Sequence, residues 1–101
     1  MSRVLVKLGT KYVEWSTVTD SPVSYGMTRE QLEAFTKEEY GNEGLREIPA
    51  RLARIERTGC SSHVDTLESL VAVNRAGPGE TEATLEELIR YAEAPAPAEE
   101  G

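Results

Sequence analysis

The feature that most constrains the fold of this chain is an abrupt change of hydrophobic period near Pro22. Residues 3–18 are typical of a β-hairpin, and the return strand over 12–18 has the alternation of a half-buried strand. From Thr28 onward, apolar residues recur every three or four positions, as they do on one face of a helix. This change predicts an α+β fold, in which an N-terminal antiparallel β-hairpin packs on three to four short helices.

The predicted hairpin turns at Gly9, which supplies the positive φ that a short turn needs. Its first strand places Val4, Val6 and Leu8 on one face. Its return strand alternates Val13, Trp15 and Thr17 with Tyr12, Glu14 and Ser16. For Val23 and Tyr25 two alternatives stay open, a brief third strand or an extended lead into the first helix. Because a lone hairpin is marginal in water, we expect it to pack on helices or on a second copy.

Capping residues mark where the first and last helices begin. Thr28 and Gln31 fit a capping box, and Gly41 is the predicted end of the first helix. Thr84 is predicted to begin the last helix, with Thr81 as the alternative.

Two further helices are predicted between them. One covers about 45–58, with Pro49 near its first helical position, and buries the stripe Leu45, Ile48, Leu52 and Ile55. The other covers about 65–75 and is capped by Ser62 or Asp65.

Length and composition predict one domain over residues 1–93 and a disordered tail over residues 94–101 (APAPAEEG). The single cysteine, Cys60, excludes an internal disulfide and fits a reducing cytoplasm. No apolar run approaches the roughly 20 residues that span a bilayer, so no membrane partner is expected.

The net charge is −7 and is concentrated toward the C-terminal end, where residues 59–101 carry two arginines against nine carboxylates. Because phosphate contacts supply most of the nonspecific affinity for nucleic acids, this acidity disfavours nucleic-acid binding. The alternative is that the acidic region mimics DNA through Glu80, Glu82, Glu86, Glu87, Glu93, Glu99 and Glu100.

A basic stripe is predicted opposite the apolar face of the 45–58 helix; it consists of Arg46, Arg51, Arg54 and Arg57. Such a stripe could contact phosphate or an acidic protein. The competing interpretation is a solvated face, on which Glu43, Glu47 and Glu56 pair with the arginines.

Trp15 and Tyr12 are the aromatic residues most relevant to binding. Aromatic side chains of a small domain usually belong to its core, yet Trp and Tyr also dominate interface hot spots. We predict that an exposed hairpin face with Trp15 and Tyr12 lies next to the arginine stripe and forms a protein-binding surface with it.

The segment Cys60-Ser61-Ser62-His63-Val64-Asp65 combines a thiol, hydroxyls, an imidazole and a carboxylate. A Cys–His pair can generate a nucleophile, but catalytic triads gather residues from distant segments, and here all lie in one loop. Cys60 and His63 supply half of a tetrahedral zinc site, and the chain has no other Cys or His. No catalytic residue, cofactor or metal is therefore predicted, and a small Cys/His enzyme or a zinc-bridged dimer stays an alternative.

Three segments, YVEWSTVTDSPV at 12–23, GMTR at 26–29 and NRAGPGE at 74–80, carry a resemblance. In them the chain resembles small proteins encoded by phages of actinobacteria, over about residues 3–92. The resemblance implies an intracellular, accessory role, and it brings no assigned activity, cofactor or site residue.

Together these observations predict a small cytoplasmic, non-enzymatic module that binds a host or phage protein. A nucleic-acid-directed regulator, acting through the arginines or through DNA mimicry, is the second hypothesis. Self-association through unpaired hairpin edges, which would give a homodimer, is a further expectation.

Overall fold

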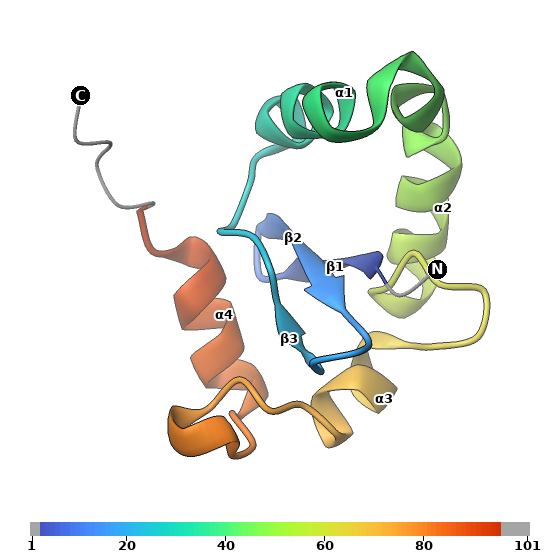
Figure 1. Ribbon diagram of the computed structural model, residues 1–101. Helices are drawn as coiled ribbons and strands as arrows, with labels where there is room; N and C mark the ends of the chain where they lie inside the picture. The colour runs from blue at the N-terminus through green and yellow to red at the C-terminus, as the bar shows by residue number, and fades with distance from the viewer. Residues whose placement is uncertain (1–2, 96–101) are drawn as a thin grey trace.

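The computed structural model describes residues 3–95 and confirms the predicted α+β fold (Figure 1). Residues 96–101 of the predicted tail lie outside the described residues. In chain order the elements are β1 (Arg3–Leu8), β2 (Lys11–Ser16), β3 (Ser21–Pro22), α1 (Arg29–Arg46), α2 (Ile48–Thr58), α3 (Leu67–Ala72), the short 3-10 helix η1 (Pro78–Glu80) and α4 (Leu85–Glu93).

The three strands form an antiparallel sheet in the order β1-β2-β3. The third strand exists, but it lies at Ser21–Pro22 rather than at Val23–Tyr25. Beyond it the chain still follows β2, because Met27 exchanges two backbone hydrogen bonds of 2.8 Å with Tyr12.

The outer edge of β1 is covered by the segment that follows α2. The N–H of Lys7 donates to the carbonyl of Gly59 at 3.0 Å, and the N–H of Ser61 donates to the carbonyl of Leu5 at 2.8 Å. The N–H of Leu5 donates to Ser61 Oγ at 2.9 Å. Since both edges of the hairpin are paired within the chain, the expectation of free edges is wrong, and pairing between copies through them loses its physical basis.

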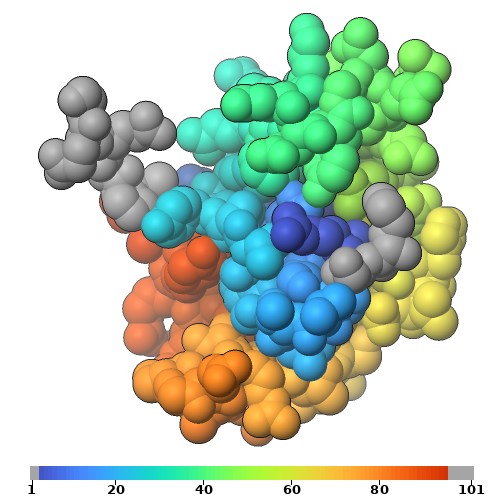
Figure 2. Space-filling model, in the orientation of Figure 1, coloured from blue at the N-terminus to red at the C-terminus, as the bar shows by residue number. Residues whose placement is uncertain are grey.

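Helices cover both faces of the sheet, as Figure 1 shows from the position of the blue strands between the green and the orange helices. In the space-filling view of Figure 2, blue atoms likewise lie between the green and the orange segments. Helices α3 and α4 cover one face, whose buried residues are Val4, Val6, Leu8, Val13 and Trp15. Helices α1 and α2 cover the other face, where Leu5 joins Met27, Leu32, Ile48, Leu52 and Ile55. The predicted exposed hairpin face therefore does not exist.

Most predicted helix ends are confirmed. Thr28 and Thr84 each form a complete capping box, and Pro49 lies in the first turn of α2. Gly41 interrupts α1 with φ 71°, so the predicted stop is a break after which the helix resumes. Helix α3 is shorter than predicted.

The cap of α3 is Thr66, whose hydroxyl accepts from the N–H of Ser69. The prediction of Ser62 or Asp65 is wrong because the Ser62 hydroxyl already accepts from the N–H groups of Val64 and Asp65 in the preceding turn.

Asn74 organises the loop between α3 and α4 and is fully buried. Its Nδ2 donates to the carbonyls of Val71 and Ala83, and its Oδ1 accepts from the N–H groups of Ala76 and Ala83. One side chain thus replaces the backbone pairing that this irregular segment lacks.

The C-terminal end of α4 is fixed to the N-terminal part of the chain at three places. Thr10 Oγ1 donates to Glu93 Oε2 at 2.7 Å. A Cβ atom added to Gly26 would lie 1.8 Å from the carbonyl oxygen of Ala92, so only glycine allows this approach. Tyr91 donates to the carbonyl of Ser24 at 2.8 Å.

Candidate functional site

Two of the four predicted arginines meet in an open hollow of about 420 Å³, which we call the arginine hollow. Arg51 and Arg54 lie three residues apart on α2 and so share one face of the helix. Arg3 from β1 and His63 from the loop before α3 also line the hollow. The other lining residues are Val4, Thr17, Glu47, Ser61, Ser62, Val64 and Asp65. Sequence reasoning missed Arg3, because only the packing of α2 on β1 brings it here.

The other two predicted arginines lie outside the arginine hollow. Arg46 is exposed at the end of α1, in a shallow depression that Glu43 and Glu47 also line. Arg57 is exposed in the last turn of α2. The predicted stripe is therefore divided into two residues that converge and two that do not.

The arginines of α2 do not pair with neighbouring glutamates, so this part of the solvated-face interpretation is wrong. Within residues 3–95 the ion pairs are Arg3–Glu14, Arg29–Glu33 and Arg90–Glu86. Arg54 instead donates through Nε to the carbonyl of Ser61. This bond uses one of the five donors of its guanidinium and fixes the direction of the group.

Arg51 is half-buried, and its electrostatic surroundings are mixed. Burial lowers the pKa of its guanidinium, and the charge of Arg54 lowers this pKa as well. The carboxylates of Glu14 and Glu47 act in the opposite direction. Because an arginine remains protonated in proteins, Arg51 places a partly desolvated positive charge in the hollow.

A buried carboxylate, that of Glu14, lies on the sheet face that α1 and α2 cover. It is 2% exposed, its Oε1 accepts a 2.5 Å hydrogen bond from the hydroxyl of Tyr40, and the same oxygen lies 3.6 Å from Arg3 Nη1. Its Oε2 has no hydrogen-bond partner among the described residues. Burial raises the pKa of Tyr40, and the hydrogen bond to Glu14 raises it further.

Trp15 lies in the core and offers no binding surface. It is fully buried between the sheet and helices α3 and α4. Its indole Nε1 has no hydrogen-bond partner within residues 3–95. The prediction that Trp15 is exposed is wrong, because alternation along a strand distinguishes two faces but does not reveal that both are covered.

Tyr12 lies on the opposite face of the sheet from Trp15 and is half-buried. It packs against the cluster that contains Leu5. Lys7 Nζ lies 5.7 Å from the centroid of its ring, within the range of a cation–π contact. Tyr12 and Trp15 therefore belong to different surfaces, and only Tyr12 reaches solvent.

The loop with Cys60 and His63 does not create an activated thiolate. Cys60 is fully buried, and burial raises the pKa of its thiol. A nucleophilic cysteine needs a lowered pKa and an accessible sulfur atom. His63 is exposed, and the N–H of Ser62 donates to Cys60 Sγ at 3.4 Å. The arrangement fits a structural role for this thiol.

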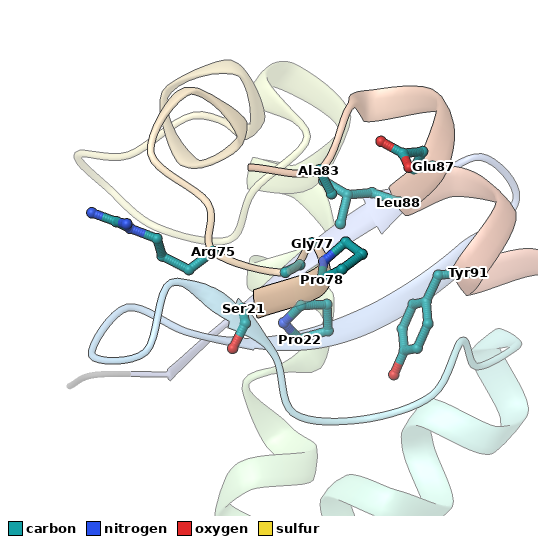
Figure 3. Close-up of a pocket in the computed structure, with 10 residues that line it drawn as sticks. Ser21, Pro22, Arg75, Gly77, Pro78, Ala83, Glu87, Leu88 and Tyr91 are labelled. Atoms are coloured by element: carbon teal, nitrogen blue, oxygen red, sulfur yellow. The ribbon is translucent and has the colours of Figure 1, made fainter. Parts of the chain in front are cut away.

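A second site, which sequence reasoning missed, is an open hollow of about 380 Å³ between β3, the 75–78 segment and α4; we call it the apolar cleft (Figure 3). Pro22, Pro78, Leu88 and Tyr91 surround it, whereas the side chain of Arg75 projects away. In the sequence the two prolines indicate turns. Only the tertiary structure brings them against α4.

An aromatic pair lies beside the apolar cleft. The rings of Tyr25 and Tyr91 stack with centroids 6.2 Å apart. Tyr25 is 52% exposed and Tyr91 is 39% exposed, although both rings are large and largely apolar. Tyr91 is still buried enough for burial to raise the pKa of its phenol.

No cluster of three or more His, Cys, Asp or Glu side chains suited to a metal ion occurs within residues 3–95. In the same part of the chain, no helix is long and apolar enough to cross a membrane. Comparisons with protein-family models, with curated proteins and with solved structures find no match. The function is therefore inferred from the geometry.

Proposed function

We propose that this chain is a small, non-enzymatic interaction module of the cytoplasm that binds a protein through the apolar cleft and the Tyr25–Tyr91 pair. The observation that carries this proposal is the exposed, stacked aromatic pair at the edge of an apolar hollow. Tyrosine is enriched among the residues that contribute most to protein interfaces. A cleft of this size accommodates an apolar side chain of a partner.

The surface is held in place before any partner arrives. The hydroxyl of Tyr91 donates to the carbonyl of Ser24, and the close approach of Gly26 to Ala92 fixes the segment that carries Tyr25. The N–H of Arg75 donates to the carbonyl of Asp20, which joins the segments on two sides of the cleft. A preorganised surface loses little conformational entropy on binding.

Exposed apolar residues extend the surface along the edge of the sheet. Val23 is 41% exposed and directly follows β3. A second apolar hollow, lined by Val23, Tyr25, Met27 and Phe35 among others, lies along the same segment. Contiguous apolar surface of this kind is typical of interaction sites.

DNA mimicry has weaker support, because several carboxylates of the acidic region are engaged within the chain. Glu87 accepts from the N–H of Thr84, Glu93 accepts from Thr10, and Glu86 pairs with Arg90. Direct contact with nucleic acid through Arg51, Arg54 and Arg57 is opposed by the net charge of −7. The resemblance to phage proteins supports a partner from the phage or from its actinobacterial host.

The test is a capture experiment with nuclease-treated lysates of infected and uninfected actinobacterial cells, followed by affinity measurements with the purified prey. The baits are the wild type, Tyr25→Ser and, as the control, Val18→Ser, since Val18 is 75% exposed and lines neither the apolar cleft nor the arginine hollow. We expect one stoichiometric protein whose affinity falls at least about tenfold with Tyr25→Ser and is unchanged with Val18→Ser. Equal affinity for all three baits, or no prey in either lysate, would contradict the proposal.

A further inference from the structure

The arginine hollow and the apolar cleft share no lining residue, so the arginine hollow calls for an explanation of its own. Its guanidinium groups come from residues far apart in the sequence, Arg3 on β1 and the pair Arg51 and Arg54 on α2. Like charges repel, and their convergence is unfavourable unless counter-charges accompany them.

Arg3 forms the one ion pair of the hollow within the described residues, because Glu14 Oε1 lies 3.6 Å from Arg3 Nη1. Two carboxylates, of Glu47 and Asp65, line the hollow without forming an ion pair with Arg51 or Arg54. The carboxylates of Glu14 and Glu47 favour the charged form of Arg51 from a greater distance. Within the described residues, the two α2 guanidiniums therefore have no carboxylate in direct contact.

The Arg51 guanidinium is partly withdrawn from water. Arg51 and Arg54 are half-buried, whereas Arg46 and Arg57 on the neighbouring surface are exposed. Removing an unpaired charge from water costs free energy, and an anion held between two guanidiniums recovers part of it. The bond from Arg54 Nε to the carbonyl of Ser61 sets the direction of one of these groups in advance.

We propose that the arginine hollow binds a single phosphate monoester group, held between the guanidiniums of Arg51 and Arg54 with Arg3 at its side. The planar fork of an arginine matches two oxygens of a phosphate, and such charge-assisted hydrogen bonds are about twice as strong as neutral ones. His63 lines the same hollow, and a ring N–H of its imidazole adds a further hydrogen-bond donor.

The carboxylates of Glu47 and Asp65 restrict the ligand class. They lie in the same hollow and would repel the successive phosphates of an extended nucleic-acid strand. The net charge of −7 opposes any polyanion at longer range. A compact dianion that reaches only the two guanidiniums avoids most of this repulsion.

The test is a titration of the full chain with inorganic phosphate and with O-phosphoserine, followed by NMR of the backbone amides and the arginine Nε–H groups. Sodium chloride at matched ionic strength is the control titration. We expect saturable shifts at Arg51, Arg54 and residues of the adjoining loop, with a dissociation constant of roughly 1 mM. An equal or tighter value for O-phosphoserine supports a phosphate monoester as the ligand, and a markedly weaker value would show that the hollow takes free phosphate and would overturn the monoester.

Three variants make the result specific. Arg51→Gln should weaken binding at least about tenfold, whereas Arg57→Gln, an exposed arginine of the same helix outside the hollow, should leave it unchanged. Glu47→Gln should strengthen binding a few-fold because it removes a repelling carboxylate. Shifts that chloride reproduces, shifts that do not saturate, or equal losses in Arg51→Gln and Arg57→Gln would overturn the proposal.

Discussion

The two faces of one small sheet are buried in different ways. The face beneath α3 and α4 is apolar, with Trp15 at its centre among valines and leucines. The face beneath α1 and α2 combines Leu5 with Glu14, a residue with a carboxylate that is buried just as deeply. Since neighbouring residues of a strand point to opposite sides, β2 contributes Trp15 to one layer and Glu14 to the other.

This difference shows how a short strand can serve two purposes. The sheet residues of the apolar face, Val4, Val6, Leu8, Val13 and Trp15, carry no ionisable group, so their burial requires no charged partner. The polar face holds charged groups that need partners, and its rim is where Arg3 and Arg51 gather into the arginine hollow. Stability should therefore be lost most easily through the first face, and sensitivity to solution conditions should be greater at the second.

The largest effect is expected from the centre of the apolar face. Trp15→Ala removes a fully buried indole and should lower the free energy of unfolding by about 3–5 kcal/mol. Val18→Ala, at a 75% exposed position soon after the same strand, should change it by less than about 0.5 kcal/mol. Urea denaturation followed by circular dichroism measures both. Similar values for the two variants would show that this face is not the main source of stability.

Asn74→Ala should have the next largest effect, because it leaves buried N–H and carbonyl groups of the loop before α4 without partners. We expect a loss of about 2–3 kcal/mol in the free energy of unfolding. Asn42→Ala, at an exposed asparagine in α1, is the matched control and should lie within about 0.5 kcal/mol of the wild type. An Asn74→Ala loss as small as that of the control would mean that the loop does not hold α4 against the apolar face.

The polar face is tested by alkaline titration. The pKa of Tyr40 is raised in the folded state, first by burial and then by Glu14, so the folded protein retains a proton that the unfolded chain releases above about pH 10. Stability is therefore fully present below that pH and is lost as the pH rises toward the folded pKa. Burial also raises the pKa of Tyr91 on α4, so its ionisation likewise lowers stability as the pH rises above about 10.

Urea unfolding of the wild type, Tyr40→Phe and Tyr91→Phe at about pH 8 and pH 11 separates the two sides. Each phenylalanine should make the alkaline loss of stability smaller than in the wild type. The burial that raises the pKa of the Cys60 thiol adds a loss common to all three proteins. An alkaline loss that neither substitution reduces would rule out these phenols as its source.

The smallest effects are expected at the helix caps, and they should be alike on the two sides. Thr28→Ala removes the capping box of α1, and Thr84→Ala removes that of α4. Each should cost about 1 kcal/mol, measurable as a small fall in Tm by thermal denaturation. A much larger loss for Thr84→Ala would indicate that α4 depends on its cap more than on its packing.

Local signals predicted much of this fold. The caps at Thr28 and Thr84 and the position of Pro49 follow from short-range chemistry, and each is confirmed. Gly41 was predicted to end the first helix, but it only interrupts α1. Thr66 was missed as a cap because Ser62 and Asp65 offer the same chemistry a few residues earlier, and only the turn at Ser62 distinguishes them.

The two candidate sites could be predicted less well than the fold, because each is formed by residues that are far apart in the sequence. Arg51 and Arg54 were identified from their helical spacing, but their meeting with Arg3 depends on how α2 crosses β1. The prediction that Trp15 is exposed was wrong because, over six residues, the sequence of a strand buried on one face differs little from that of a strand buried on both. The pairing of Ser61 with the outer edge of β1 could not be predicted from the sequence, since Ser61 and its partner Leu5 are 56 positions apart.

The attachment of α4 to Thr10, Ser24 and Gly26 has a consequence for biosynthesis. On the ribosome the hairpin emerges before the helices, and α4, one of the two helices that cover its tryptophan face, emerges after the other helices of residues 3–95. Until then the nascent chain displays an apolar sheet surface, which is the kind of segment that chaperones bind and that aggregates if synthesis stalls. Native structure on that side should therefore form only after translation has passed α4, and ribosome-bound chains arrested before it should be cut by protease where the released protein is resistant.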